Sequence, residues 1–106
     1  MGTPAALANA SLRGLDLARA NLAGADCRGA DLRGTNLGGA TLTDANLAGA
    51  NFFKSVLDAA DLAGANLIGA RFLNCAQLET TRNWQSAFRD PDLACGAPVP
   101  MIADPP

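Results

Sequence analysis

The 106-residue chain contains no histidine and no tyrosine, and its only aromatic residues are four Phe and one Trp. Histidine is the most frequent general base and a frequent metal ligand in proteins, so its absence removes much hydrolytic and metal chemistry. The sequence also holds no glycine-rich phosphate loop and no cluster of metal-ligating residues. The carboxylates recur before a leucine, where a short polar side chain hydrogen-bonds turn backbone. We therefore expect no enzyme activity, no cofactor and no metal.

Long apolar runs and a strong excess of one charge are also missing. No stretch approaches the roughly 20 apolar residues that a membrane-spanning helix requires, so membrane insertion is not expected. The formal net charge is -2, and no run rich in Lys or Arg could follow a phosphate backbone. Nucleic acid is therefore not expected as a partner, and a protein partner is favoured.

What the sequence does contain is a period of five residues. An apolar residue returns at every fifth position fourteen times without a break, and a small residue usually lies two positions before it. Five residues advance a helical side chain by about 140°, so a helix would scatter the apolar residues around its surface. A continuous strand would place successive ones on opposite faces. The chain must therefore turn once per phrase. The predicted inward-facing core is Leu7, Leu12, Leu17, Leu22, Cys27, Leu32, Leu37, Leu42, Leu47, Phe52, Leu57, Leu62, Leu67 and Phe72.

Turn-forming residues occupy the fifth position of most phrases. Glycine recurs there, and Asn9, Asp44 and Asn74 take its place in three phrases. These residue types accept the left-handed backbone of a tight turn. The predicted product is a solenoid with flat sides, although the period alone does not distinguish three sides from four.

The unbroken phrase of Ala, Asp or Asn, Leu, any residue and Gly resembles the pentapeptide-repeat family. The resemblance covers residues 5–75 and implies an all-β solenoid, namely a right-handed quadrilateral β-helix with four phrases per coil. The repeat would then form about three and a half coils with a short α-helical C-terminal cap. We expect a leader at residues 1–4, the β-helix at 5–75, the cap at 76–96 and a flexible proline-rich tail at 97–106.

The repeat register ends after Cys75, and the segment that follows is predicted to cover the last coil. Leu78, Trp84 and Phe88 lie near helical spacing, which predicts one short helix or two helical turns with an apolar face toward the open coil. The Arg-Asn-Trp run that ends at Trp84 also looks like the helical cap of many bacterial and thylakoid-lumen family members. A second short helix is predicted by an N-cap residue, a proline and a terminating glycine: Asp90, Pro91 and Gly96.

The three cysteines have separate interpretations. Cys27 takes an inward leucine position and is predicted to be a small core residue. Cys75 and Cys95 bracket the cap, and a disulfide between them would tie the cap to the last coil. The alternative is two unrelated thiols in a reducing cytosol. The bonded form would favour the periplasm or the thylakoid lumen, and the unbonded form the cytoplasm.

Large apolar residues occupy three outward positions: Phe53, Ile68 and Leu73. Phe53 and Leu73 are twenty residues apart and would stack in one column of a four-sided coil. Either the cap folds over them, or they form a protein-binding patch. At the other end only Met1 to Pro4 precede the first phrase, so a dimer through the uncapped N-terminal end, or truncation of a longer protein, would each explain the open coil.

The charges of residues 5–75 are balanced, with six acidic and six basic side chains. Some members of the resembled family inhibit DNA gyrase by imitating duplex DNA, which requires a long and strongly acidic rod. A short and neutral repeat disfavours that role. The sequence predicts a non-enzymatic structural or protein-interaction module without an assigned biological role, and a topoisomerase inhibitor or protector is the alternative.

Overall fold

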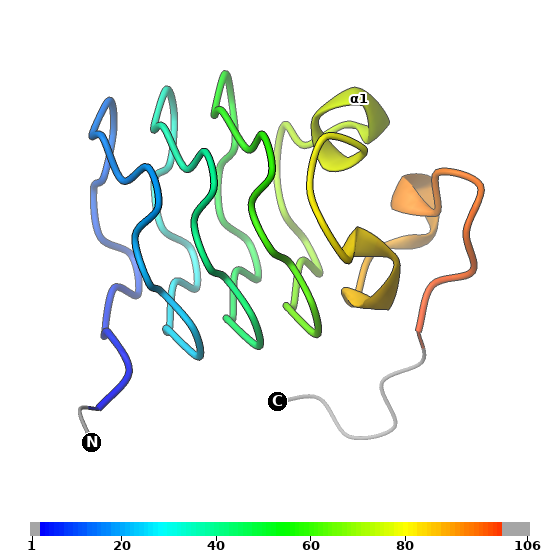
Figure 1. Ribbon diagram of the computed structural model, residues 1–106, viewed down its shortest axis with the longest axis horizontal. Coiled ribbons are helices and arrows are strands. Elements are labelled where there is room, and N and C mark those ends of the chain that lie inside the picture. Colours follow the sequence, from blue (N-terminus) through cyan, green and yellow to red (C-terminus); the bar gives the residue numbers. More distant parts are fainter. Residues whose placement is uncertain (1–2, 101–106) are drawn as a thin grey trace.

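The structure is a computed structural model that describes residues 3–100. Figure 1 shows stacked coils that begin at the N-terminus and end against a compact C-terminal segment. Parallel bridges join residues twenty positions apart, from Ala6 and Asp26 to Asn51 and Arg71. One coil therefore takes four phrases of five residues. Each bridge involves a single residue on either side, so the β-helix is held by isolated bridges rather than by extended strands.

The corners of the coils explain the five-residue period. From Asn9 to Gly69 the last residue of each phrase has a positive φ, which is 67° at Gly14 and 59° at Asn9. Glycine and asparagine accept this left-handed conformation at low cost. Lys54 and Ala59 adopt it as well, so the stacking of the coils imposes the corner even where the residue does not favour it. Asn74 was expected at such a corner, but its φ is -129°.

The core consists of inward leucines that alternate with small residues. Eight inward residues of the middle and later coils are at most 2% exposed: Leu32, Leu37, Leu42, Leu47, Phe52, Leu57, Leu62 and Leu67. Cys27 fills a leucine position, and burial raises the pKa of its thiol to about 11. The inward residues of the first coil are only partly buried, because no described segment lies over them: Leu7, Leu12, Leu17 and Leu22.

Phe72 does not take the inward position that the period predicts. Its φ is +57°, two residues before the next corner is due, and its side chain is 63% exposed. Leu73 packs against the core instead. The expected core role of Phe72 is therefore wrong, because the chain leaves the coil register here to begin helix α1 (Cys75–Leu78).

Helix α1 begins with a reciprocal capping box. The side chain of Asn74 accepts a hydrogen bond from the Gln77 N–H at 2.8 Å, and the Gln77 side chain accepts one from the Asn74 N–H at 3.1 Å. Asn74 thus starts the helix rather than turning a corner. The other helical elements are the 3-10 turns η1 (Trp84–Ser86) and η2 (Pro91–Leu93).

The residues on either side of η1 continue the coil ladder. Arg82 bridges to Asp61, and Phe88 bridges to Asn66. These pairings satisfy backbone groups that the last full coil would otherwise leave open. The expectation of one helix with Trp84 and Phe88 on the same face is therefore wrong, whereas the alternative of two helical turns matches α1 and η1. Trp84 and Leu78 are buried at the end of the core, whereas Phe88 is half-buried within the ladder.

The expected second helix is only the single turn η2, which ends before Gly96. Asp90 makes no side-chain cap to this turn. It accepts a hydrogen bond from the Gly69 N–H at 2.9 Å, which holds the turn against the coil. Residues 1–2 of the expected leader and 101–106 of the expected tail lie outside the described residues. Within residues 3–100, no helix combines the length and the apolar character needed to cross a membrane.

Candidate interaction surface

The repeat has no net charge, but coiling places most of its basic residues on one side and most of its acidic residues on the other three. One side is formed by residues 10–14, 30–34, 50–54 and 70–74, and we call it the basic face. It carries four bases and one acid: Arg13, Arg33, Lys54, Arg71 and Asp31. Within residues 5–74 the other three sides share two bases and five acids: Arg19, Arg28, Asp16, Asp26, Asp44, Asp58 and Asp61. The basic face therefore offers a positive surface that the net charge conceals.

An open groove of about 500 Å³ lies at the cap end of the basic face. Seven residues line it: Phe53, Lys54, Ser55, Phe72, Leu73, Asn74 and Gln77. We call it the Phe53–Phe72 groove. Its two rings meet edge to face, with centroids 5.5 Å apart and planes inclined by 70°. Phe53 is 46% exposed, so the cap does not fold over it.

A cation stands beside the aromatic pair. Lys54 Nζ lies 5.4 Å from the centre of the Phe53 ring. An aromatic ring attracts a cation through its negative face, and the ammonium group keeps its remaining donors available to a bound anion. The groove therefore combines exposed apolar surface with one positive charge.

The floor of the groove is rigid. Gln77 Nε2 donates to the carbonyl oxygens of Phe52 at 3.1 Å and Ser55 at 3.4 Å, while its oxygen caps α1. The Ser55 hydroxyl donates to the Leu32 carbonyl at 2.6 Å and is buried. Because these polar groups are already bonded within the protein, they hold the shape of the groove and leave no free polar group at this part of its floor.

The structure brings together only part of the expected patch. Phe53 and Leu73 line the groove, and Phe72 joins them. Ile68 is 37% exposed but belongs to the neighbouring side, residues 65–69. Phe72 was missed because the period assigned it to the core. The sequence signal that could have indicated its exposure is a large aromatic residue at the very end of the repeat.

Two arginine–aspartate pairs repeat on adjacent sides of the second coil. Arg28 binds Asp26 and Arg33 binds Asp31 through two hydrogen bonds each, at distances of 2.6 to 2.8 Å. The Arg33 guanidinium lowers the pKa of Asp31 to about 2. Asp31 therefore stays charged and neutralises part of the basic face. Within residues 3–100, Lys54 at the groove and Arg71, which precedes Phe72 in the chain, form no ion pair.

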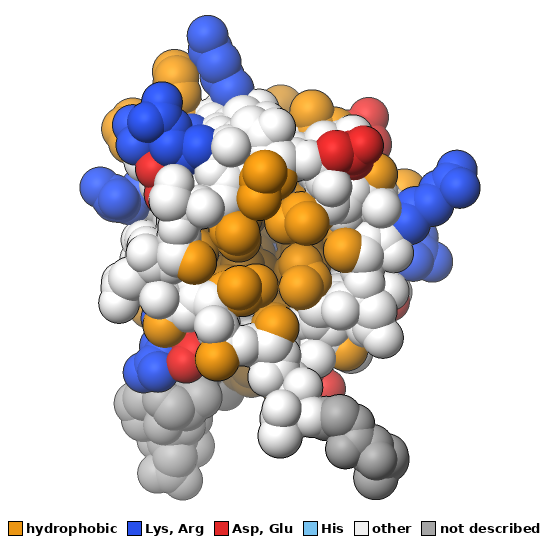
Figure 2. All heavy atoms as spheres, turned by 90° about the vertical axis from the view of Figure 1, so that its left-hand side faces the viewer, with side chains coloured by type: hydrophobic (Ala, Val, Ile, Leu, Met, Phe, Trp, Pro, Cys, Tyr) orange, Lys and Arg blue, Asp and Glu red, His pale blue; other side chains and the backbone are white. Residues whose placement is uncertain are grey.

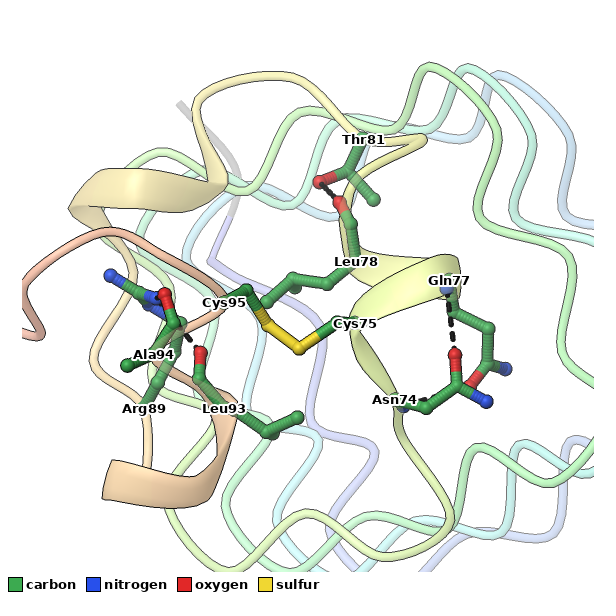
Figure 3. The surroundings of a disulfide bond; sticks show 9 residues. All are labelled: Asn74, Cys75, Gln77, Leu78, Thr81, Arg89, Leu93, Ala94 and Cys95. Atoms are coloured by element: carbon green, nitrogen blue, oxygen red, sulfur yellow. Dashed lines mark hydrogen bonds between the residues drawn. A yellow bond between two sulfur atoms is a disulfide. The ribbon is translucent and has the colours of Figure 1, made fainter.

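A disulfide joins Cys75, the first residue of α1, to Cys95 beyond η2 (Figure 3). The two Cα atoms are 5.6 Å apart. Glu79 lies near the two sulfur atoms and could complete a set of metal ligands, but sulfur atoms bonded to each other are not thiolate ligands. The bond instead connects the start of the cap to its end.

The sequence analysis overlooked Arg89, which is 2% exposed and occupies an inward position above Leu67. Its guanidinium donates five hydrogen bonds to backbone oxygens, at 2.8 to 3.2 Å. The acceptors are Gln85, Ala87, Leu93, Ala94 and Pro98. The same group lies 5.0 Å from the centre of the Trp84 ring, and Figure 3 shows it beside Leu93 and Ala94. Arg89 thus organises the cap around one buried charge. No sequence motif predicts that this arginine is buried.

Comparisons with known proteins agree with this architecture. A family model described as pentapeptide repeats matches residues 5–39 and 35–74. The chain is 33% identical to Rfr23, a pentapeptide repeat protein from the cyanobacterium Cyanothece 51142, with a TM-score of 0.51 over 82% of this chain. It spans 58% of the length of Rfr23. A pentapeptide repeat protein from the Arabidopsis thaliana thylakoid lumen is 24% identical, with a TM-score of 0.53 over 92% of this chain and 68% of its own. No curated protein matches the chain.

Proposed function

Because the chain belongs to the pentapeptide-repeat family, we propose that it is a non-enzymatic protein-interaction module that binds a partner through the Phe53–Phe72 groove. We assign its coils the right-handed quadrilateral form of that family. The observation that carries the proposal is the pair of exposed rings beside Lys54 on a face with four bases. Exposed aromatic residues above a rigid floor are typical of surfaces that bind other proteins.

The groove selects a partner by two properties. Phe53 and Phe72 favour an apolar side chain, since burying them removes apolar area from water. Lys54 and Arg71 favour acidic residues next to that side chain. We therefore propose an acidic protein segment that carries an apolar anchor.

The gyrase alternative has no structural support on these coils. A DNA mimic must present rows of negative charge along its length. Within residues 5–74 no two acidic residues lie twenty positions apart, so no side carries such a row. We also propose an oxidising compartment such as the periplasm or the thylakoid lumen, because structural disulfides persist there.

A designed peptide tests the groove directly. The probe is a Glu-rich peptide with a single Leu, and its controls replace every Glu by Gln or the Leu by Ser. Fluorescence anisotropy should show the strongest binding for the probe. Phe72→Ala should weaken its binding about tenfold, as truncation of an aromatic anchor does at other interfaces.

The matched control is Ile68→Ala, which removes an exposed apolar side chain from the neighbouring side. It should leave the affinity unchanged. Phe72 is largely exposed, so both variants should keep the melting temperature of the parent protein. Equal binding of the probe and its Gln control, or equal losses in the two variants, would contradict the proposal.

A further inference from the structure

The N-terminal end of the solenoid exposes its core. Figure 2 faces this end and shows hydrophobic side chains gathered at its centre, with charged side chains around the rim. The inward residues of the first coil are Leu7, Leu12, Leu17 and Leu22, and all four are only partly buried. The opposite end is closed by α1, η1 and η2. The two ends of the described solenoid are therefore unequal.

The same end also carries an open ladder of backbone groups. In the second coil, the Asp26 N–H donates to the Ala5 oxygen at 2.9 Å, and the Arg28 oxygen accepts from the Asn9 N–H at 2.7 Å. The equivalent groups of the first coil point away from the second coil and have no partner among the described residues. They are the N–H groups of Ala6, Ser11, Asp16 and Asn21, the carbonyl groups of the same four residues, and the carbonyl groups of Ala8, Arg13, Ala18 and Ala23. An open edge of this kind is a template for pairing with another chain.

We propose that two copies of this chain associate head to head through their first coils, related by a twofold axis perpendicular to the solenoid. A second copy fits because its own edge repeats the same donors and acceptors every five residues. The twofold axis can pass through the coil in four registers that place each open N–H opposite an open carbonyl. The side chains that face each other determine which of the four registers is favoured.

In one register the axis passes through the corner between Gly14 and Leu15. Arg13 then lies opposite Asp16 of the second copy, and Asp16 lies opposite its Arg13. In the other three registers, the charged residues of the first coil face uncharged ones. The same axis places Leu12 opposite Leu17 of the second copy. Charge complementarity therefore selects this corner.

The size of the end sets the expected strength of the dimer. The shortest extent of the chain is 20 Å between Cα atoms, so the end of the coil offers each copy on the order of 400 Å², which is small for a specific interface. A weak dimer is therefore expected. Because the C-terminal end is covered, head-to-head contact closes the assembly at two copies and does not extend into a fibre.

Sedimentation equilibrium of the 106-residue chain tests the proposal. The parent protein should sediment as a dimer of 10.8 kDa chains. Arg13→Asp places like charges opposite each other twice per dimer and should raise the dissociation constant about tenfold or more. Adding Asp16→Arg to the same chain should restore it.

Arg71→Asp is the matched control, because Arg71 is exposed on the same side but three coils further from the end. It should leave the dissociation constant unchanged, and circular dichroism should show that every variant keeps its fold. A monomer at all concentrations would overturn the proposal. So would a dimer that Arg13→Asp does not weaken, or one that the double variant does not restore.

Discussion

Replacing Arg89 tests whether one buried charge organises the cap. The guanidinium is 2% exposed and donates to five backbone oxygens between residues 85 and 98. In Arg89→Ala these oxygens lose the guanidinium donors, with only the Ala97 N–H still bonded to the Ala94 oxygen, and a space opens beside Trp84. Leaving a buried acceptor without its donor costs about 1 to 3 kcal/mol, and the space adds to that cost. The total approaches the stability of a small domain, which is about 5 to 15 kcal/mol.

Two further replacements separate the hydrogen bonds from the packing. Arg89→Met keeps most of the volume against Trp84 but offers no donors, so we expect a loss of about 3 kcal/mol from the stranded oxygens. Arg89→Lys keeps the charge with three donors and should lose less. Urea unfolding followed by Trp84 fluorescence measures all three, with the losses ordered Ala, Met and Lys.

Arg82→Met is the matched control, because Arg82 lies in the same segment, is exposed and makes one side-chain bond, to the Ala59 oxygen at 3.1 Å. It should change stability by less than about 1 kcal/mol. The reasoning is refuted if Arg89→Met is as stable as the parent protein. Apolar packing alone would then suffice, as it does in some proteins whose buried ion pairs have been replaced.

Two other perturbations follow from the same structure. Replacing Cys75 and Cys95 by serine opens a loop closed over 20 residues and should cost about 3 kcal/mol of unfolding free energy, read from urea midpoints against the oxidised parent; an unchanged midpoint would mean that the bond does not hold the cap. The Arg33 guanidinium lowers the pKa of Asp31 from 3.8 to about 2. The contribution of the Arg33–Asp31 ion pair to folding stability is therefore complete above about pH 4 and is lost as the pH falls toward 2. NMR titration should show this pKa rising in Arg33→Ala, and a pKa near 2 in that variant would contradict the assigned cause.

The period predicted the coiled core because it depends on local rules. An apolar residue every fifth position cannot be buried by a helix or a single strand, so Leu32 to Leu67 had to face inward at successive turns. The end of the repeat followed other rules. Phe72 fits the period, yet the chain leaves the coil there because the capping box of Asn74 and Gln77 starts α1.

The cap was the least predictable part because its conformation depends on backbone pairing with the last coil of the solenoid. Helical spacing placed Trp84 and Phe88 on one face, but the open backbone of the last coil drew Phe88 into the ladder. Pairing across the coils overrode a weak local preference. Arg89 acquired an interior position by the same pairing, and its five acceptors are in place only once the cap is folded.

The sequence by itself determined that the chain coils, since its leucines, small residues and turn-forming corners recur in one unbroken register. It also determined the balance of charge in the repeat. Only the tertiary structure decided which residues meet, because twenty-residue pairing assigns each side chain to one side of the coil. That pairing gathered four bases on one face, set Phe53 against Phe72, and left the first coil open.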